Sequence, residues 1–317
     1  METPPESINV IQETDTGTKS VGALDALAAS KPAVIVDDPH QGQVVDLLLT
    51  MLQNQSLSNR HHLIVDSLTS IARTRGVRFA TAVPKVSHDE RYVNCLNIRP
   101  SLQIMPTFCN IIRGAISSLQ SYYLGQLTLL VRAISHHIRA CVTDIIELIN
   151  DVWDTLSQRL PLVALVEALA DALASEFKPH VAGLISKLLP ILQSDKTNLL
   201  AAIQVKALAA LTALAYNLQD YMNTVVPIVI TCYEYSHTPF MLRTQAIETL
   251  TKLSSALELY PYTSRIIHSL MPILAEPNES LHQVIIDALH TFTYTLGPSF
   301  TIFVPVLVKV CKVTVAY

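Results

Sequence analysis

Two pairs of adjacent histidines are the first residues of this chain whose chemistry could suggest a metal site. They are His61-His62 and His136-His137. Neighbouring side chains on a helix point about 100° apart, so neither pair can chelate an ion in the i, i+4 manner of a helical zinc site. His282 and His290 are eight residues apart and would need a ligand from a third element. We therefore predict no metal site and interpret these histidines as structural polar positions.

Catalytic residue types are present, but none of their groupings predicts an active site. Ser87, His88 and Asp89 have the composition of a hydrolase triad, yet triads are assembled in space and not by adjacency. Three carboxylates fit a solvated helix face better than an acid/base pair, and they are Glu147, Asp151 and Asp154. Phosphate-binding glycine loops and kinase motifs do not occur in the sequence. We expect no catalytic residue, no cofactor and no small-molecule substrate.

Composition narrows the class of protein further. Charged residues make up 15% of the chain, against roughly 25% in average domains. The net charge of −4 and the lack of a basic run argue against a nucleic-acid partner. The polar first 20 residues contain no signal peptide, so we expect a cytoplasmic or nuclear protein. The five cysteines fit buried thiols of a reduced protein, and they are Cys95, Cys109, Cys141, Cys232 and Cys311.

The stretch from Ala288 to Val308 lacks charged residues and is long enough to span a bilayer. Gly297-Pro298 divides it, and His290 lies within it. Two packed helices are therefore expected there instead of a membrane span. The sole tryptophan, Trp153, closes an apolar helical stripe, and we predict that it packs in a core.

A recurring leucine indicates which elements organise the chain. The leucine stands at the third place of a polar-x-Leu triplet that opens an apolar helical run, and its copies are Leu68, Leu169, Leu208, Leu250 and Leu289, with Leu127 as a weaker member because Gly125 takes the polar place. From Leu127 onward the intervals are 42, 39, 42 and 39 residues. A period of about 40 is typical of stacked helical hairpins, which bury their apolar faces only against neighbours. We predict an all-α superhelix of about six hairpins, with the repeated leucines buried on the inner helices.

Prolines fit the same hairpin plan. Joints between hairpins contain Pro179, Pro261 and Pro298, where the first turn of the next helix tolerates proline. Asp220 stands at the joint without proline and is predicted to cap a helix. A second set of prolines has apolar residues on both sides. We predict that these prolines lie inside the outer helices, and the alternative is that they mark the first residues of helices. They are Pro190, Pro227, Pro272 and Pro305.

Two segments depart from the repeat. Residues 1–40 are polar at first and aperiodic, so we expect a disordered segment with a short helix near 21–29, followed by a solenoid over 41–317. The interval from Leu68 to Leu127 is 59 residues, and deleting 87–104 restores 41. We therefore predict an exposed insertion at 87–104, either as a loop or within the first helix of its hairpin. The final helix, 300–310, is almost wholly apolar and leaves an uncovered surface.

Several segments together resemble the HEAT-repeat region of the target of rapamycin (TOR) serine/threonine kinases. The resemblance covers about 43–310, and its segments are Gln55-Ser56-Leu57-Ser58 with His61-His62, Met105-Pro106-Thr107-Phe108, residues 137–153 (HIRACVTDIIELINDVW), Ser264-Arg265-Ile266-Ile267-His268 and residues 302–310 (IFVPVLVKV). The segment 87–104 interrupts a run that is continuous in the family, and the chain stops at Tyr317. We hypothesise that 87–104 and 311–317 are translated introns or gene-model errors, which sequencing of the spliced transcript would test.

The resemblance implies a HEAT-type scaffold that carries no kinase residues. In TOR kinases such a solenoid holds regulatory subunits and helps two copies associate, which implies a role in nutrient and growth signalling for this chain. The expected partners are therefore TOR-complex subunits and a second copy, and the expected location is the cytoplasm, the nucleus or endomembranes reached through partners. A free-standing adaptor, of the transport-carrier or phosphatase-scaffold type, is the alternative.

Overall fold

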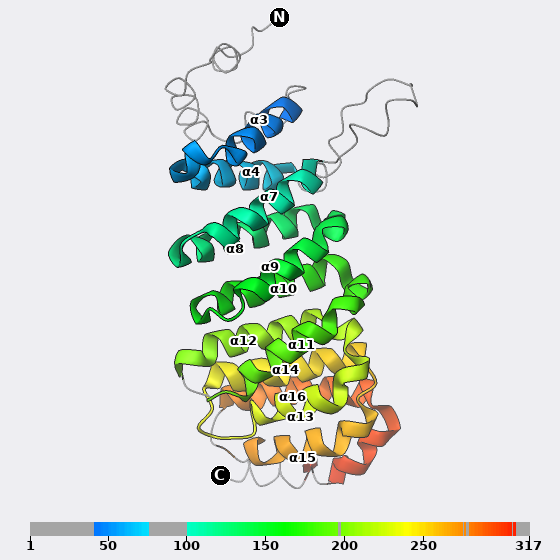
Figure 1. Ribbon diagram of the computed structural model, residues 1–317. Coiled ribbons are helices and arrows are strands. Elements are labelled where there is room, and N and C mark those ends of the chain that lie inside the picture. Colours follow the sequence, from blue (N-terminus) through cyan, green and yellow to red (C-terminus); the bar gives the residue numbers. More distant parts are fainter. Residues whose placement is uncertain are drawn as a thin grey trace, which may run out of the picture. The chain divides into compact units, whose positions relative to one another are not determined.

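The chain forms two units of stacked helices. The computed structural model describes residues 41–75, 100–195, 198–274, 276, 279–305 and 307–308 (Figure 1). Every regular element in these ranges is helical. The units comprise Met1–Gln158 and Arg159–Tyr317. Below they are called unit 1 and unit 2.

The described residues of unit 1 form two helical hairpins and one further helix. Its α-helices are α3 (Gln41–Gln53), α4 (His61–Arg75), α7 (Pro100–Gly114), α8 (Ser117–Ile134) and α9 (Val142–Val152). Within the hairpins α3 packs on α4, and α7 packs on α8. Between hairpins the inner helices α4 and α8 stack on each other, and the outer helices follow the order α3, α7, α9. Short 3-10 segments connect them at Gln55–Arg60, Ser135–Cys141 and Leu156–Gln158.

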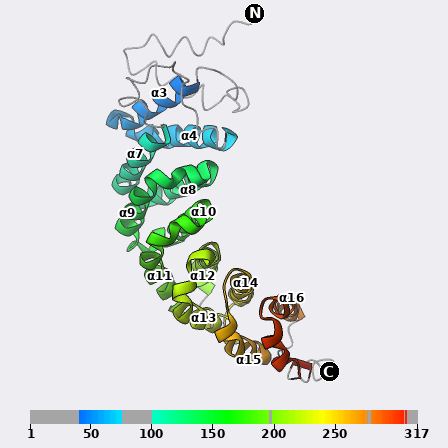
Figure 2. The same cartoon turned by 90° about the vertical axis from the view of Figure 1, so that its right-hand side faces the viewer.

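Unit 2 begins with an inner helix, which three hairpins follow. Its helices are α10 (Arg159–Leu173), α11 (Lys178–Gln193), α12 (Asn198–Ala213), α13 (Met222–Thr231), α14 (Phe240–Ala256), α15 (Thr263–Leu274) and α16 (Glu279–Thr295). The inner helices stack in the order α10, α12, α14, α16. Figure 2 shows α12, α14 and α16 nearly end-on in one layer, with α11, α13 and α15 in the other. The predicted all-α solenoid of about six helix pairs is confirmed.

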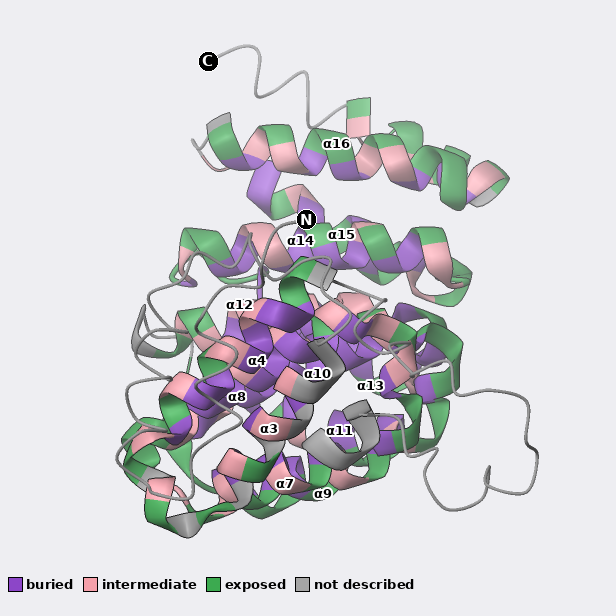
Figure 3. Cartoon of the chain, turned by 90° about the horizontal axis from the view of Figure 1, so that it is seen from above, coloured by how far each residue is buried: buried purple, intermediate pink, exposed green. Residues whose placement is uncertain are grey.

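The repeated leucines explain why the helices stack. Five of the six are buried at inner-helix positions, namely Leu68, Leu127, Leu169, Leu208 and Leu250. Leu289, on α16, is only half-buried, so the prediction is wrong at this position. Among the described inner helices of unit 2, only α14 packs on α16, and the α16 ribbon in Figure 3 carries exposed and intermediate residues (green and pink) beside buried ones (purple). One inner neighbour does not by itself expose the repeated leucine, because Leu68 on α4 is buried with α8 as its described inner neighbour.

The prolines lie mostly where the sequence predicts them. Pro179, Pro261 and Pro298 occupy the first turns of the helical segments that follow the joints. Three others lie inside outer helices, as predicted, and these are Pro190, Pro227 and Pro272. For the fourth, Pro305, helical residues are described on both sides with a gap at 306.

Asp220 does not cap a helix as predicted. It lies in the 3-10 segment Gln219–Tyr221, and α13 begins after Tyr221 without a side-chain cap. Its carboxylate instead lies 3.6 Å from the Lys178 ammonium at the preceding joint. The intervening 3-10 turn moves the acidic side chain away from the free amides of α13.

Three predicted features fall partly or wholly outside the described residues. Residues 1–40, 87–99 and 311–317 lie outside them. Residues 100–104 of the predicted insertion belong to α7, the first helix of its hairpin, so the loop alternative is wrong for these five positions. The apolar end of the chain forms a 3-10 helix, Gly297–Phe303, before further helical residues. Among the described residues, no helix has the length and apolarity needed to cross a bilayer.

Candidate protein-interaction surface

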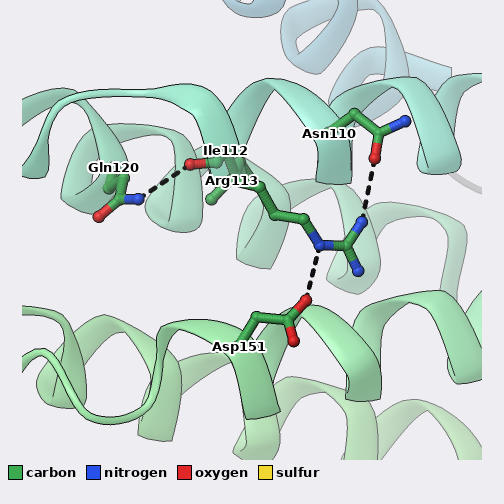
Figure 4. Close-up of polar contacts among 5 residues, drawn as sticks. All are labelled: Asn110, Ile112, Arg113, Gln120 and Asp151. Atoms are coloured by element: carbon green, nitrogen blue, oxygen red, sulfur yellow. Dashed lines mark hydrogen bonds and ion pairs between the residues drawn. The ribbon is translucent and has the colours of Figure 1, made fainter.

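Polar side chains tie the turn of each unit 1 hairpin to its inner helix. The tying residue stands seven positions before the repeated leucine. In α8 it is Gln120, whose Nε2 donates to the Ile112 carbonyl oxygen at 3.1 Å (Figure 4). In α4 it is His61, whose Nε2 lies 3.3 Å from the Asn54 carbonyl oxygen. Each contact adds a side-chain partner to a turn carbonyl oxygen that also accepts a backbone N–H, from Ala115 and from Leu57 respectively.

In unit 2 the same position carries a buried arginine. Arg243 is only 4% exposed, and its Nε donates to the Tyr233 carbonyl oxygen at 3.0 Å. Its two terminal nitrogens bind the Glu276 carboxylate at 2.7 and 2.9 Å. Arg243 thus connects two successive hairpin turns by charge-assisted bonds.

The α11–α12 turn uses another residue for this purpose, because its equivalent position is Ala201. Gln204, buried on α12, donates from Nε2 to the carbonyl oxygens of Ile191 and Ser194 at 3.2 and 3.3 Å. The hairpin turns of both units are therefore held by specific polar contacts as well as by apolar packing.

Ion pairs join neighbouring helices on the exposed faces. Arg113 on α7 donates from Nε to Asp151 of α9 at 2.8 Å and from Nη1 to Asn110 at 3.0 Å (Figure 4). Glu147 and Asp154 are exposed, which agrees with the predicted solvated face. Exposed pairs of this kind stabilise by about 0–1 kcal/mol.

The polar residue of the repeated triplet also has a structural role in unit 2. Glu167 and Lys206, each two positions before a repeated leucine, lie on adjacent inner helices with 2.5 Å between Oε2 and Nζ. The pair is partly buried and fixes the register of α10 against α12. None of these charged groups faces a pocket-like arrangement of further catalytic residue types in the described chain.

The histidines singled out from the sequence are dispersed over the described residues. His61 forms the turn contact given above, and His62 is exposed. The ring centroids of His136 and His137, in the 3-10 segment Ser135–Cys141, lie 4.0 Å apart with the rings tilted by 36°. His282 and His290 both lie on α16. The described residues contain no group of three potential metal ligands.

Three of the five cysteines are described, and all are free and buried, as predicted: Cys109, Cys141 and Cys232. Burial raises the pKa of the Cys109 thiol to about 12 and that of Cys141 to about 11. Such thiols stay protonated near neutral pH and are poor nucleophiles. Cys95, Cys311 and the segment of Ser87, His88 and Asp89 lie outside the described residues. Trp153 is buried, which confirms its predicted place in a core.

Large apolar side chains are exposed on unit 2 in a pattern that the sequence reasoning missed. At the starts of inner helices they are Leu160, Leu200, Phe240 and Met241. Leu119 of unit 1 has the equivalent place on α8, and residues 119, 160, 200 and 241 recur at intervals of 41, 40 and 41. A search for apolar residues in phase with the repeat, but outside its buried stripe, would have found them.

A second exposed set lies at the joints that follow the inner helices. It consists of Tyr216, Tyr260 and Tyr294, which are 72%, 67% and 75% exposed. Tyr294 stands just before its joint, at the end of α16, and its ring contacts His290. Tyrosine is commonly half-buried in folded proteins, so three such exposed rings on one unit indicate a surface available to partners.

Comparison with known proteins supports the resemblance drawn from the sequence. A profile described as the serine/threonine-protein kinase mTOR domain matches residues 7–135. The kinase tor1 of Schizosaccharomyces pombe is 29% identical over 83% of this chain, and mTor of Drosophila melanogaster is 27% identical over 86%. The resemblance to the TOR kinases is confirmed. TOR2 of Saccharomyces cerevisiae matches similarly, at 27% identity over 86% of the chain. The chain spans about 10% of the length of these TOR kinases, so it is similar to one segment of them.

Solved structures support the fold independently. A crystal structure of importin β superposes on 96% of this chain and 38% of its own, with a TM-score of 0.66 and 15% identity. The karyopherin Kap121p bound to Pho4p superposes on 97% of this chain and 31% of its own, with a TM-score of 0.58 and 9% identity. Identities this low establish a shared helical-repeat fold and no shared activity.

Proposed function

We propose that this chain is a non-catalytic scaffold segment of a TOR-type serine/threonine kinase, which binds regulatory subunits and supports assembly in nutrient and growth signalling. The observation that carries the proposal is the similarity to TOR kinases along most of the chain, over about a tenth of their length. The exposed apolar and aromatic residues of unit 2 support a binding role. Such a segment would work in the cytoplasm or at endomembranes that its partners reach.

Scaffolding fits the physical character of the fold. Stacked hairpins held by buried leucines and polar turn contacts give a long, preorganised surface, and preorganisation lowers the entropy lost on binding. A second copy of the chain is a further proposed partner. Phosphoryl transfer would belong to other parts of a TOR kinase, because the described residues assemble no phosphate or metal site.

Affinity capture tests the proposal. The full chain would be immobilised and exposed to purified regulatory subunits of TOR complexes, with importin β cargo as the competing class. Retention of a TOR-complex subunit at micromolar concentration or below is expected. Retention of transport cargo alone would refute the proposal in favour of the free-standing adaptor.

A further inference from the structure

The joints of unit 2 form a continuous, rigid edge. They comprise residues 174–178, 215–221, 257–262 and 296–303. Asn217 of the second joint donates from Nδ2 to the Ala174 carbonyl oxygen of the first at 2.8 Å. The Tyr262 hydroxyl of the third joint donates a hydrogen bond to Asn223, which lies just beyond the second joint.

The same edge continues to the end of α16. The hydroxyls of Thr295 and Ser254, near the last two joints, lie 3.4 Å apart. Lys178 and Asp220 add an exposed ion pair between the first two joints. These contacts hold the backbone of this edge, which we call the joint edge, in one arrangement before any partner binds.

Aromatic rings and carboxylates are the exposed recognition groups of the joint edge. The rings are those of Tyr216, Tyr260 and Tyr294. Within the joints the charged residues are Glu176, Lys178, Asp220 and Glu258, and the pairing of Lys178 with Asp220 leaves a net charge of −2. Lys252 and Arg265 lie outside the joints, on α14 and α15. In two joints an exposed ring and an exposed carboxylate stand within four residues, Tyr216 with Asp220 and Tyr260 with Glu258.

Both kinds of group select the same ligand chemistry. The face of an exposed tyrosine ring attracts a lysine or arginine side chain by about 0.5–1 kcal/mol. A nearby carboxylate attracts the same cation and fixes its position. Resting on the scaffold function proposed above, we propose that the joint edge binds an extended, lysine- and arginine-bearing segment of a partner protein.

A fluorescence-anisotropy titration of the full chain tests this proposal. The probe is a labelled twelve-residue peptide in which lysine and arginine alternate with glycine and serine. The matched probe has glutamate at every basic position. We expect saturable binding of the basic peptide at about 0.1 M salt and none of the acidic one. Equal binding of both peptides would overturn the proposal.

Variants locate the site. The double variant Tyr216→Ser/Tyr260→Ser should weaken binding about tenfold, because truncating an interface tyrosine commonly costs more than 1 kcal/mol. Phenylalanine at both positions keeps the ring faces and should retain affinity within about twofold. Tyr235→Ser is the matched control, because Tyr235 is an exposed unit 2 tyrosine that lies in the α13–α14 hairpin turn. An equal loss in the control, or no loss in the double serine variant, would contradict the assignment.

The outcomes separate this inference from the function on which it rests. If a TOR-complex subunit is captured equally well by the wild-type chain and by the double serine variant, the scaffold function stands and the joint edge is not the site. If the basic peptide binds through the two rings while no subunit is captured, the joint edge stands and the scaffold function falls. Far-UV circular dichroism of each variant checks that the helices are intact.

Discussion

The same Leu→Ala substitution at Leu208 and at Leu289 measures how much burial between stacked inner helices contributes to the free energy of unfolding. Both occupy the repeated position of an inner helix, but Leu208 is fully buried on α12, whereas Leu289 is half-buried on α16. Leu→Ala removes about three carbon groups, or roughly 2.4 kcal/mol of transfer free energy at about 0.8 kcal/mol per group. For Leu208 the cavity left behind adds to this, giving about 3–4 kcal/mol. For Leu289 only about 1 kcal/mol is expected, since the site opens to water.

Hydrogen exchange measured by mass spectrometry is the suitable assay, because stacked repeats can open locally without unfolding throughout. Leu208→Ala should speed exchange in α12 and in the helices that flank it, α10 and α14. Leu289→Ala should affect α16 and little else. Urea unfolding followed by circular dichroism gives the total loss. Equal losses for the two variants would show that burial between inner helices is not what stabilises the stack.

Three further predictions follow from the buried contacts and the backbone. Arg243→Met should destabilise unit 2 by about 2–4 kcal/mol in urea unfolding, because it leaves a half-buried carboxylate and a carbonyl without their donor; a loss below about 1 kcal/mol would make the contact incidental. Gly125→Ala, inside α8 with free space around the new methyl group, should raise the melting temperature, whereas Gly297→Ala should lower it because that residue has φ +53°. Burial raises the pKa of the Cys109 and Cys141 thiols above the ordinary value of 9.0, so the folded state binds more protons than the unfolded state in alkali. The free energy of unfolding should therefore be highest below pH 9 and fall as the pH rises toward about 11–12. Alanine at both cysteines should flatten that slope, and an unchanged slope would contradict the assignment.

The helical repeat could be predicted from the sequence because the spacing of apolar residues and the side chains that a helix buries are both local properties of the chain. Polar-x-Leu triplets at intervals near 40 placed the inner helices, and prolines placed the joints. The buried cysteines and Trp153 were also predictable, since apolar residues at helical spacing have few alternatives to a core. The family resemblance rested on ordered segments, and sequence comparison confirmed it without any coordinates.

Tertiary structure decided what each exposed or polar residue does. Whether Leu289 is buried depends on a neighbouring helix, and whether Asp220 caps α13 depends on a 3-10 turn of three residues. The Arg243–Glu276 contact joins residues 33 positions apart, and no local pattern predicts such a pair. The exposed tyrosines of the joint edge look like ordinary core aromatics in the sequence. Only the stacking of whole hairpins determines which side of a ring meets water, because that depends on packing between elements and not on the propensities of any one of them.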